Sequence, residues 1–245
     1  DGYQSGGLSQ LLEILKPLNL RLVVMAPDSA RSGFSMAMTS QSPVTFHKIS
    51  EDDNLTIYAC SGTPVDCVKL AFYAILGDEK PDLVIAGINH GDNASVNVHY
   101  SGTMGVTIEG CLKGIPSIAF SSCDASPSGN YMNYSPYIQD IVRFVLREGL
   151  PERTCLNVNF PKEESCKGLK ICRQDRGDWH QEWEVCRREN GSEHYWLSGY
   201  YESQEPMSTD TDRWALEHGY IAVTPTTVDV TSYPLLEALK SKFEG

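Results

Sequence analysis

The sequence predicts an α/β fold: a Rossmann-like, doubly wound and mostly parallel sheet, with an aromatic β-hairpin protruding in the C-terminal third. Over the first 160 residues, short apolar runs of strand length alternate with segments of helical periodicity. This alternation is typical of repeated strand–helix–strand units that build a parallel sheet. Farther along, Asn190-Gly191 separates two aromatic-rich alternating runs, which is a strong signal for a hairpin.

We expect the chain of 245 residues to form one large domain in two parts. Residues 1–160 should form the Rossmann-like core. Residues 161–245 should complete the same domain, with a hairpin extension at 178–201 followed by a return helix near 210–217 and a last strand at 219–224.

The elements of the core follow from apolar spacing. Strands are expected at residues 21–26, 55–60, 82–88, 115–121 and 154–160. The run at 82–88 is apolar on both faces, as parallel sheets require of their inner strands. Helices are expected at 7–17, from Pro64 to near Gly77, from about 103 to 113, and from a Ser135-Pro136 cap to Gly149.

The helix after strand 55–60 has a complete start signal. Thr63 can cap the helix, Pro64 suits the first helical position, and the charge of Asp66 meets the free N–H groups of the first turn. We therefore interpret this conspicuous Gly-Thr-Pro-Val-Asp-Cys segment as structural.

Composition and charge narrow the possible functions. The formal net charge of −12 argues against binding to duplex DNA or RNA, whose partners carry basic surfaces. A transmembrane helix is excluded, because no stretch approaches about 18 uninterrupted apolar residues. Eight cysteines without a C-x-x-C pair, and no visible signal peptide, favour reduced thiols in the cytoplasm. A single small anion can still bind where a metal or backbone N–H groups hold it.

Polar segments follow the predicted strands at the edge where doubly wound sheets bind ligands. One of them, Ser101-Gly102-Thr103, opens a helix and offers hydroxyl groups, close backbone approach and free N–H groups. This combination suits a phosphate group. An ordinary helix cap with a turn glycine explains the same residues equally well.

Oxygen ligands are available nearby from Asp1, Ser32 and Asn89. Hard cations such as Mg²⁺ and Mn²⁺ bind ligands of this kind. From spacing alone, the simpler interpretation is that Asn89 is a turn residue and Ser32 a loop hydroxyl.

Several motifs occur in a fixed order along the whole chain. They are Asp1-Gly2-Tyr3, Ala26-Pro27-Asp28 with Arg31-Ser32-Gly33, Gly62-Thr63-Pro64 with Asp66-Cys67, Gly87-Ile88-Asn89 with Gly91 and Asn93, Tyr100-Ser101-Gly102-Thr103, Leu156-Asn157-Val158-Asn159, and residues 219–225. This arrangement resembles the SurE family of survival-protein phosphatases, which are metal-dependent 5′/3′-nucleotidases.

The resemblance implies a SurE-like Rossmann fold with a protruding swapped segment, and release of phosphate from nucleoside 5′-monophosphates, with 3′-monophosphates as further substrates. It implies one divalent metal per subunit, Mg²⁺ or Mn²⁺, bound by Asp1, Ser32 and Asn89, with Asp1 also as the catalytic carboxylate. Phosphate-side groups are implied at Asn93, Ser101, Gly102 and Thr103. A homodimer or homotetramer through the hairpin and the C-terminal region is implied as well.

The sequence departs from the family at its start. The first Asp of the family's Asn-Asp-Asp-Gly motif, the preceding Asn and the first strand would all lie before residue 1. We expect these residues upstream of the present sequence, because an inner strand would otherwise be missing from the sheet. The alternative is a nucleotide-binding module without turnover. A dehydrogenase is disfavoured, since no G-x-G-x-x-G follows an early strand.

Overall fold

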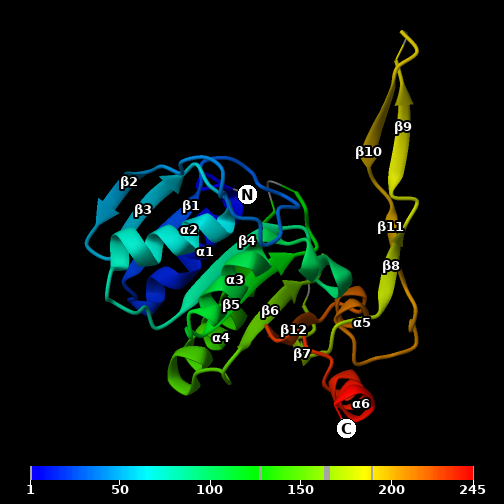
Figure 1. The fold of residues 1–245 in the computed structure, drawn as a ribbon. Helices are drawn as coiled ribbons and strands as arrows, with labels where there is room; N and C mark the ends of the chain where they lie inside the picture. The colour runs from blue at the N-terminus through cyan, green and yellow to red at the C-terminus, as the bar shows by residue number, and fades with distance from the viewer. Residues whose placement is uncertain (1, 127–128, 163–165, 189, 245) are drawn as a thin grey trace.

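The predicted alternation of strands and helices is present in the computed structural model, which describes residues 2–126, 129–162, 166–188 and 190–244 (Figure 1). The body contains the helices α1 (Gly6–Leu15), α2 (Pro64–Leu70), α3 (Gly102–Leu112), α4 (Ser135–Glu148) and α5 (Asp212–Glu217). Its strands are β1 (Leu22–Pro27), β2 (Phe46–Asp52), β3 (Leu55–Cys60), β4 (Val84–His90), β5 (Ser117–Ser122), β6 (Thr154–Phe160), β7 (Leu169–Ile171) and β12 (Ile221–Thr227). The predicted strands 55–60 and 154–160 have the observed bounds.

The predicted mostly parallel α/β architecture is confirmed, and the body strands of the described residues are hydrogen-bonded in two groups. The first has the order β1-β3-β2, and the second has the order β4-β5-β6-β12-β7. Strands β4, β5 and β6 are parallel, as are β1 and β3, whereas β2 and β12 run antiparallel to their neighbours β3 and β6. The sheets are therefore mostly parallel but mixed at their margins. Strands β1 and β4 are not hydrogen-bonded to each other.

Helices cover both faces of the second sheet. Helix α1 contacts α4 on one face, and α2 contacts α3 on the other. Helix α4 buries four aliphatic side chains, Ile138, Ile141, Val142 and Val145, against Phe120 and Phe160 of the sheet. Burial of each such aliphatic side chain contributes about 1.5–3 kcal/mol. This packing holds the carboxyl ends of β4, β5 and β6 in fixed positions.

Two strands and one α-helix of the described residues were not predicted. Strand β2 pairs with β3 across a two-residue turn, but its burial pattern is largely exposed, so it shows no apolar alternation. Strand β7 has only three residues. Helix α6 (Tyr233–Phe243) has no buried residue. The predicted Ser135 cap was wrong, because Tyr134 occupies the cap position and Ser135 is the first helical residue, its hydroxyl donating to the Met132 carbonyl.

The predicted hairpin is present as a long arm that stands away from the body (Figure 1). It consists of two successive strand pairs: β8 (Gly177–His180) with β11 (Tyr200–Ser203), and β9 (Trp183–Arg187) with β10 (Glu193–Leu197). The ladder is interrupted between the pairs, where Gln181 and Gly199 adopt positive φ angles. Of the predicted turn, Glu189 lies outside the described residues, and the Asn190 side chain accepts a hydrogen bond from the Ser192 N–H.

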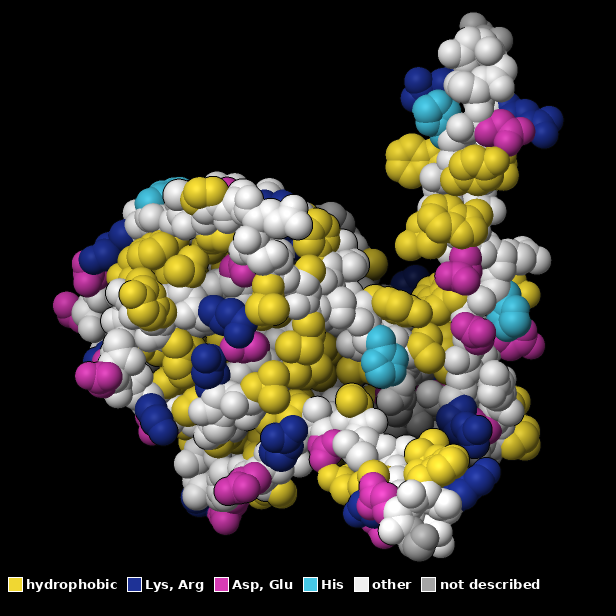
Figure 2. Space-filling view, in the orientation of Figure 1, with side chains coloured by type: hydrophobic (Ala, Val, Ile, Leu, Met, Phe, Trp, Pro, Cys, Tyr) yellow, Lys and Arg dark blue, Asp and Glu magenta, His cyan; other side chains and the backbone are white. Residues whose placement is uncertain are grey.

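Apolar side chains gather along the middle of the arm (Figure 2). Five of the large apolar residues in β9 and β10 are exposed: Trp183, Val185, Tyr195, Trp196 and Leu197. Among the described residues, no helix combines the length and the apolar character needed to cross a membrane.

Candidate active site

One cavity is lined by residues at the carboxyl ends of β1 and β4, and it continues into the gap between these two strands, which are not hydrogen-bonded to each other. Over much of its length it is lined by apolar side chains of α1, β1 and β4. Near the carboxyl ends of the two strands its lining becomes polar. Six of the predicted site residues line this cavity: Ser32, Asn89, Asn93, Ser101, Gly102 and Thr103. Asp1 lies outside the described residues. The three loops singled out from the sequence therefore converge on one space, where open α/β sheets bind their ligands.

Asn89 is the penultimate residue of β4, and its side chain is held in a defined orientation. Its Nδ2 donates to the Gly91 carbonyl at 2.7 Å and to the His90 carbonyl at 3.3 Å. An amide has two hydrogens on nitrogen and only acceptor capacity on oxygen. Because the nitrogen is engaged within the loop, Oδ1 is the atom that can bind a cation.

The start of α3 has the features of an anion cradle. The Ser101 hydroxyl accepts a hydrogen bond from the Met104 N–H, and the Ser101 carbonyl accepts one from the Gly105 N–H. The N–H groups of Gly102 and Thr103 belong to the first turn, where no intrahelical acceptor exists. Glycine at 102 allows the close approach of α2, since a Cβ there would make a tight contact of 3.0 Å with the Pro64 ring. A helix of eleven residues adds the positive end of its dipole.

Asn93 is buried in a polar network rather than facing the cavity freely. Its backbone N–H donates to Asn159 Oδ1 at 2.7 Å, and its Nδ2 donates to Ser121 Oγ at 2.6 Å. Asn157 Nδ2 donates in turn to the Asn93 carbonyl at 2.8 Å. The network ties the loop after β4 to the ends of β5 and β6. One amide hydrogen of Asn93 is thus engaged in positioning the loop.

The structural interpretation of the Thr63–Asp66 segment is confirmed by a complete capping box at the start of α2. Asp66 N–H donates to the Thr63 hydroxyl, and Thr63 N–H donates to the Asp66 carboxylate at 2.9 Å. Burial alone raises the pKa of Asp66, but hydrogen bonds from Thr39 and Thr63 outweigh it and hold that pKa below its ordinary value. The carboxylate is thereby committed to the helix and to the neighbouring loop.

Further polar residues that line the cavity were not predicted as site residues. They include Arg31, which precedes Ser32, and Asp92 and Asn97, which lie in the loop between β4 and α3. The available signal was position alone, since Arg31 and Asp92 lie within predicted segments and Asn97 lies between two of them. The loop carrying Arg31 is fixed to the start of α3, because the Ser35 hydroxyl donates to the His99 carbonyl at 2.6 Å and the Ser35 N–H to the Tyr100 carbonyl at 3.1 Å.

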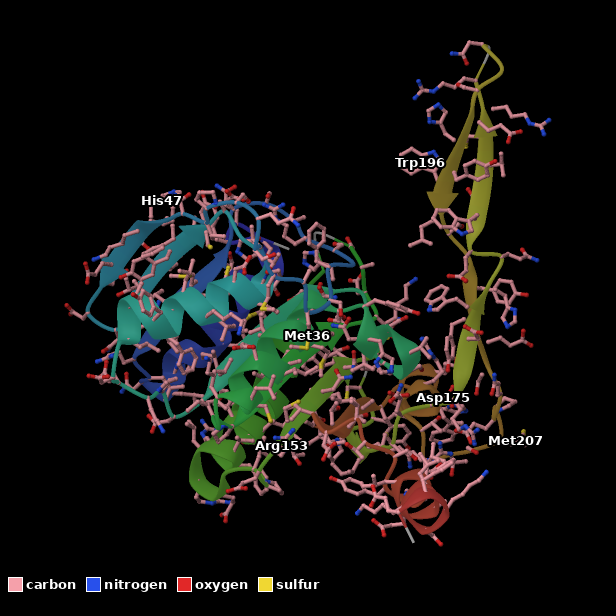
Figure 3. The ribbon with its side chains drawn as sticks, viewed as in Figure 1. Met36, His47, Arg153, Asp175, Trp196 and Met207 are labelled. Atoms are coloured by element: carbon pink, nitrogen blue, oxygen red, sulfur yellow. The ribbon has the colours of Figure 1, made fainter. Side chains whose placement is uncertain are left out.

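The foot of the arm also contacts the loop between β4 and α3. Trp179 Nε1 of β8 donates to Asn97 Oδ1 at 2.9 Å. Arg213 of α5 lies 3.4 Å from the Asp92 carboxylate and stacks over the Tyr201 ring of β11. Asp175 lies at the foot of the arm (Figure 3) and accepts hydrogen bonds from the Tyr201 and Ser203 hydroxyls. One wall of the site is therefore joined to the arm.

The described lining suits a hard divalent cation. Ser32 contributes a hydroxyl oxygen and Asn89 an amide oxygen, and such ligands are typical for Mg²⁺ and Mn²⁺ with water completing the shell. Within residues 2–126, 129–162, 166–188 and 190–244, no group of three or more His, Cys, Asp or Glu side chains is placed to hold a metal ion.

Comparison with known proteins bears on the family to which the chain belongs. A family model described as survival protein SurE matches residues 1–181. The chain is 52% identical over 241 residues to the 5′-nucleotidase SurE of Bacteroides fragilis, an alignment that covers 98% of this chain and 94% of the relative. It is 43% identical over 244 residues to the 5′-nucleotidase SurE of Flavobacterium psychrophilum, covering 98% and 94%. The crystal structure of the SurE protein from Aquifex aeolicus superimposes with a TM-score of 0.83 at 38% identity, covering 99% of this chain and 96% of that one.

Proposed function

This chain belongs to the SurE family of 5′-nucleotidase-type hydrolases, and we propose that it is a divalent-metal-dependent phosphomonoesterase acting on nucleoside monophosphates. The observation that carries this proposal is the convergence of oxygen ligands and an anion cradle on one cavity. Ser32 and Asn89 approach from the ends of β1 and β4, and Ser101-Gly102-Thr103 lies at the start of α3.

The residues of the chain have distinct parts in this proposal. Ser32, Asn89 and Asp1 would hold the metal, Mg²⁺ or Mn²⁺, and Asp1 would also be the catalytic carboxylate. A bound cation neutralises charge on a phosphoryl oxygen and polarises the P–O bond. The N–H groups of Gly102 and Thr103, with the Ser101 and Thr103 hydroxyls, would orient the remaining phosphoryl oxygens. Preorganised donors of this kind stabilise the charge that develops during phosphoryl transfer. Asn93 would support the same group with its second amide hydrogen.

The test is a screen for phosphate release from nucleoside 5′- and 3′-monophosphates. We expect activity on 5′-monophosphates to stop with EDTA and to return with added Mg²⁺ or Mn²⁺. Release from 3′-monophosphates would extend the substrate class. Full activity after thorough metal removal, or binding of nucleotide without any release of phosphate, would contradict the proposal. The second result would instead indicate a nucleotide-binding module without turnover.

Two substitutions test the metal ligands. Ser32→Ala and Asn89→Asp should each change the metal concentration needed for half-maximal activity by roughly tenfold or more, and calorimetry should detect the same change in direct Mn²⁺ binding. Ser29→Ala is the matched control, because Ser29 belongs to the same loop but donates only to Asp28. Equal metal titrations in all three variants would reject these ligands.

We further propose that the protein assembles as a homodimer or homotetramer through the arm and the C-terminal region. Exposed aromatic side chains of β9 and β10 support this, because a two-stranded ribbon cannot bury them by itself. Helix α6 also exposes Leu235, Leu239 and Phe243. We place the activity in the cytoplasm, in agreement with cysteines such as Cys60 and Cys67, which are buried thiols in the core.

A further inference from the structure

Binding of a phosphate group by this protein poses an electrostatic problem, because the chain has a net charge of −12. The cavity between β1 and β4 is lined by few cationic side chains: among the described residues, Arg21, Arg31 and Lys80 carry a full positive charge. Arg21 and Lys80 precede β1 and β4, whereas Arg31 follows β1. A strand of six residues spans roughly 20 Å. Arg21 and Lys80 therefore lie at the opposite end of the sheet from Ser32 and Asn89.

Arg31 is held beside the cradle at the start of α3. Its Nη2 donates to the Ser61 carbonyl at 3.0 Å, which anchors one side of the guanidinium group. Its backbone lies next to Gly102, since a Cβ built on that glycine would be 3.8 Å from the Arg31 carbonyl oxygen. The hydrogen bonds of Ser35 to the carbonyls of His99 and Tyr100 fix this approach.

The guanidinium group of Arg31 retains unused donor capacity. Its Nε is buried and has no hydrogen-bond partner among the described residues. Leaving a buried donor without an acceptor is costly, and more so when the group is charged. Asp28 approaches the guanidinium only to 3.6 Å, across a partly exposed surface, so the positive charge is incompletely compensated. An anion that reaches the polar end of the cavity would supply the missing acceptor.

We propose that Arg31 is a substrate-binding residue that donates to a phosphoryl oxygen of the nucleotide held at Gly102 and Thr103. This inference rests on the function proposed above and adds a charged donor to the cradle. Arginine suits the role because its planar, permanently charged guanidinium can donate to two oxygens of one phosphate. The anchor at Ser61 leaves the remaining donors preoriented.

The test compares Arg31→Gln, Arg31→Lys and the control Arg143→Gln. Arg143 lies exposed on α4, pairs with Asp140 and carries the same charge. The measurements are the KM for a nucleoside 5′-monophosphate, the inhibition constant of inorganic phosphate, and the Mn²⁺ concentration for half-maximal activity. We expect Arg31→Gln to raise the KM and the inhibition constant by roughly tenfold or more, as loss of a charge-assisted hydrogen bond predicts. Arg31→Lys should fall between Arg31→Gln and the wild type.

The outcomes separate this inference from the proposed function. The Mn²⁺ requirement should stay unchanged in Arg31→Gln, which would show that the adjacent Ser32 loop is intact. If the wild type hydrolyses the nucleotide and both Arg31 variants bind phosphate as tightly as Arg143→Gln does, the role of Arg31 is rejected and the nucleotidase proposal survives. If the wild type neither binds phosphate nor hydrolyses nucleotides, the proposed function itself is wrong. If Arg31→Gln fails to fold, Arg31→Lys alone decides, and a phosphate affinity equal to that of the wild type would reject a two-oxygen contact.

Discussion

The body and the arm of this protein are built from strands of similar length under opposite conditions. In β5 and β6 nearly every side chain is buried, with Phe120 and Phe160 stacked at 6.0 Å between ring centroids. In β9 every residue is exposed, including Trp183 and Val185. The body strands gain their stability from contacts within the same chain. The arm strands gain little from their own chain beyond one neighbouring strand.

The two regions therefore owe their stability to different contacts. The body has a buried apolar core of its own, in which side chains such as Phe120 and Phe160 are removed from water. Isolated two-stranded ribbons are marginally stable in water, and exposed aromatic clusters mark interaction surfaces. The conformation of the arm therefore depends on what covers it, and the proposed second copy of the chain is that cover.

The largest expected effect comes from truncating one aromatic side chain in each region. Phe120→Ala should lower the free energy of unfolding by about 3–5 kcal/mol, since Phe120 is fully buried in the core cluster that β5 shares with α4 and β6. Trp196→Ala should leave the unfolding of the body nearly unchanged, because Trp196 is 66% exposed on β10. Denaturant unfolding at one fixed protomer concentration measures both effects.

Trp196→Ala should act on assembly instead. Light scattering should show a lower average mass for this variant, and replacement of residues 182–198 by a short turn should give a monomer. Tyr73→Ala, which truncates an exposed aromatic side chain of the body, is the control that should leave the mass unaltered. An oligomer that persists without the arm tip would refute the proposed role of the arm.

The body was more predictable from the sequence than the arm for the same physical reason. Burial imposes apolar periodicity, so β3 and β6 could be bounded to the residue. The arm strands alternate as well, but the interruption of the ladder at Gln181 and Gly199 could not be predicted from apolar spacing. No residue of β9 is buried, so burial imposes no apolar pattern that would mark the interruption. Helix α6 and strand β2 were missed because each is almost wholly exposed.

The candidate site shows a related limit. The convergence of Ser32, Asn89 and the Ser101 loop could be predicted, because parallel strands direct their carboxyl ends to one edge. Contacts between sequence-distant side chains could not. Trp179 and Asn97 are 82 residues apart, and the commitment of Asn93 to Ser121 depends on the exact register of β4 and β5.

An intermediate effect is expected at Asp66, whose carboxylate caps α2 beside the cavity. Because hydrogen bonds hold its folded-state pKa below the ordinary value of 3.8, ionised Asp66 stabilises the folded state above that pH. The contribution is lost as the pH falls through the folded-state pKa. Asp66→Asn should therefore cost about 1–2 kcal/mol at pH 7, and the difference from the wild type should shrink towards pH 3. Denaturant titrations at several pH values measure it, and a pH-independent difference would contradict the capping role.

The smallest expected effect on stability comes from a substitution at the foot of the arm, where the arm contacts the body. It tests whether the two regions are independent. Trp179→Phe keeps an aromatic ring at the foot of the arm but removes the donor to Asn97 Oδ1. Loss of one such hydrogen bond should lower the free energy of unfolding by about 1 kcal/mol. The indole N–H can only donate, so it binds Asn97 Oδ1 and leaves Asn97 Nδ2 directed towards the Asp92 carboxylate. Loss of this orientation in the lining of the cavity should raise the KM for nucleotide while kcat changes little.

Trp214→Phe is the matched control, because the Trp214 ring stacks on His218 and Tyr220 and its replacement leaves the Asn97 contact in place. If Trp179→Phe alone raises the KM, the arm and the site form one mechanical unit, and covering the arm in an oligomer also stabilises the substrate site. If the two variants have equal KM values, the contact at 2.9 Å between Trp179 and Asn97 supports only the fold of the arm. The arm would then contribute nothing to substrate binding, and the residues that bind the nucleotide would all belong to the body.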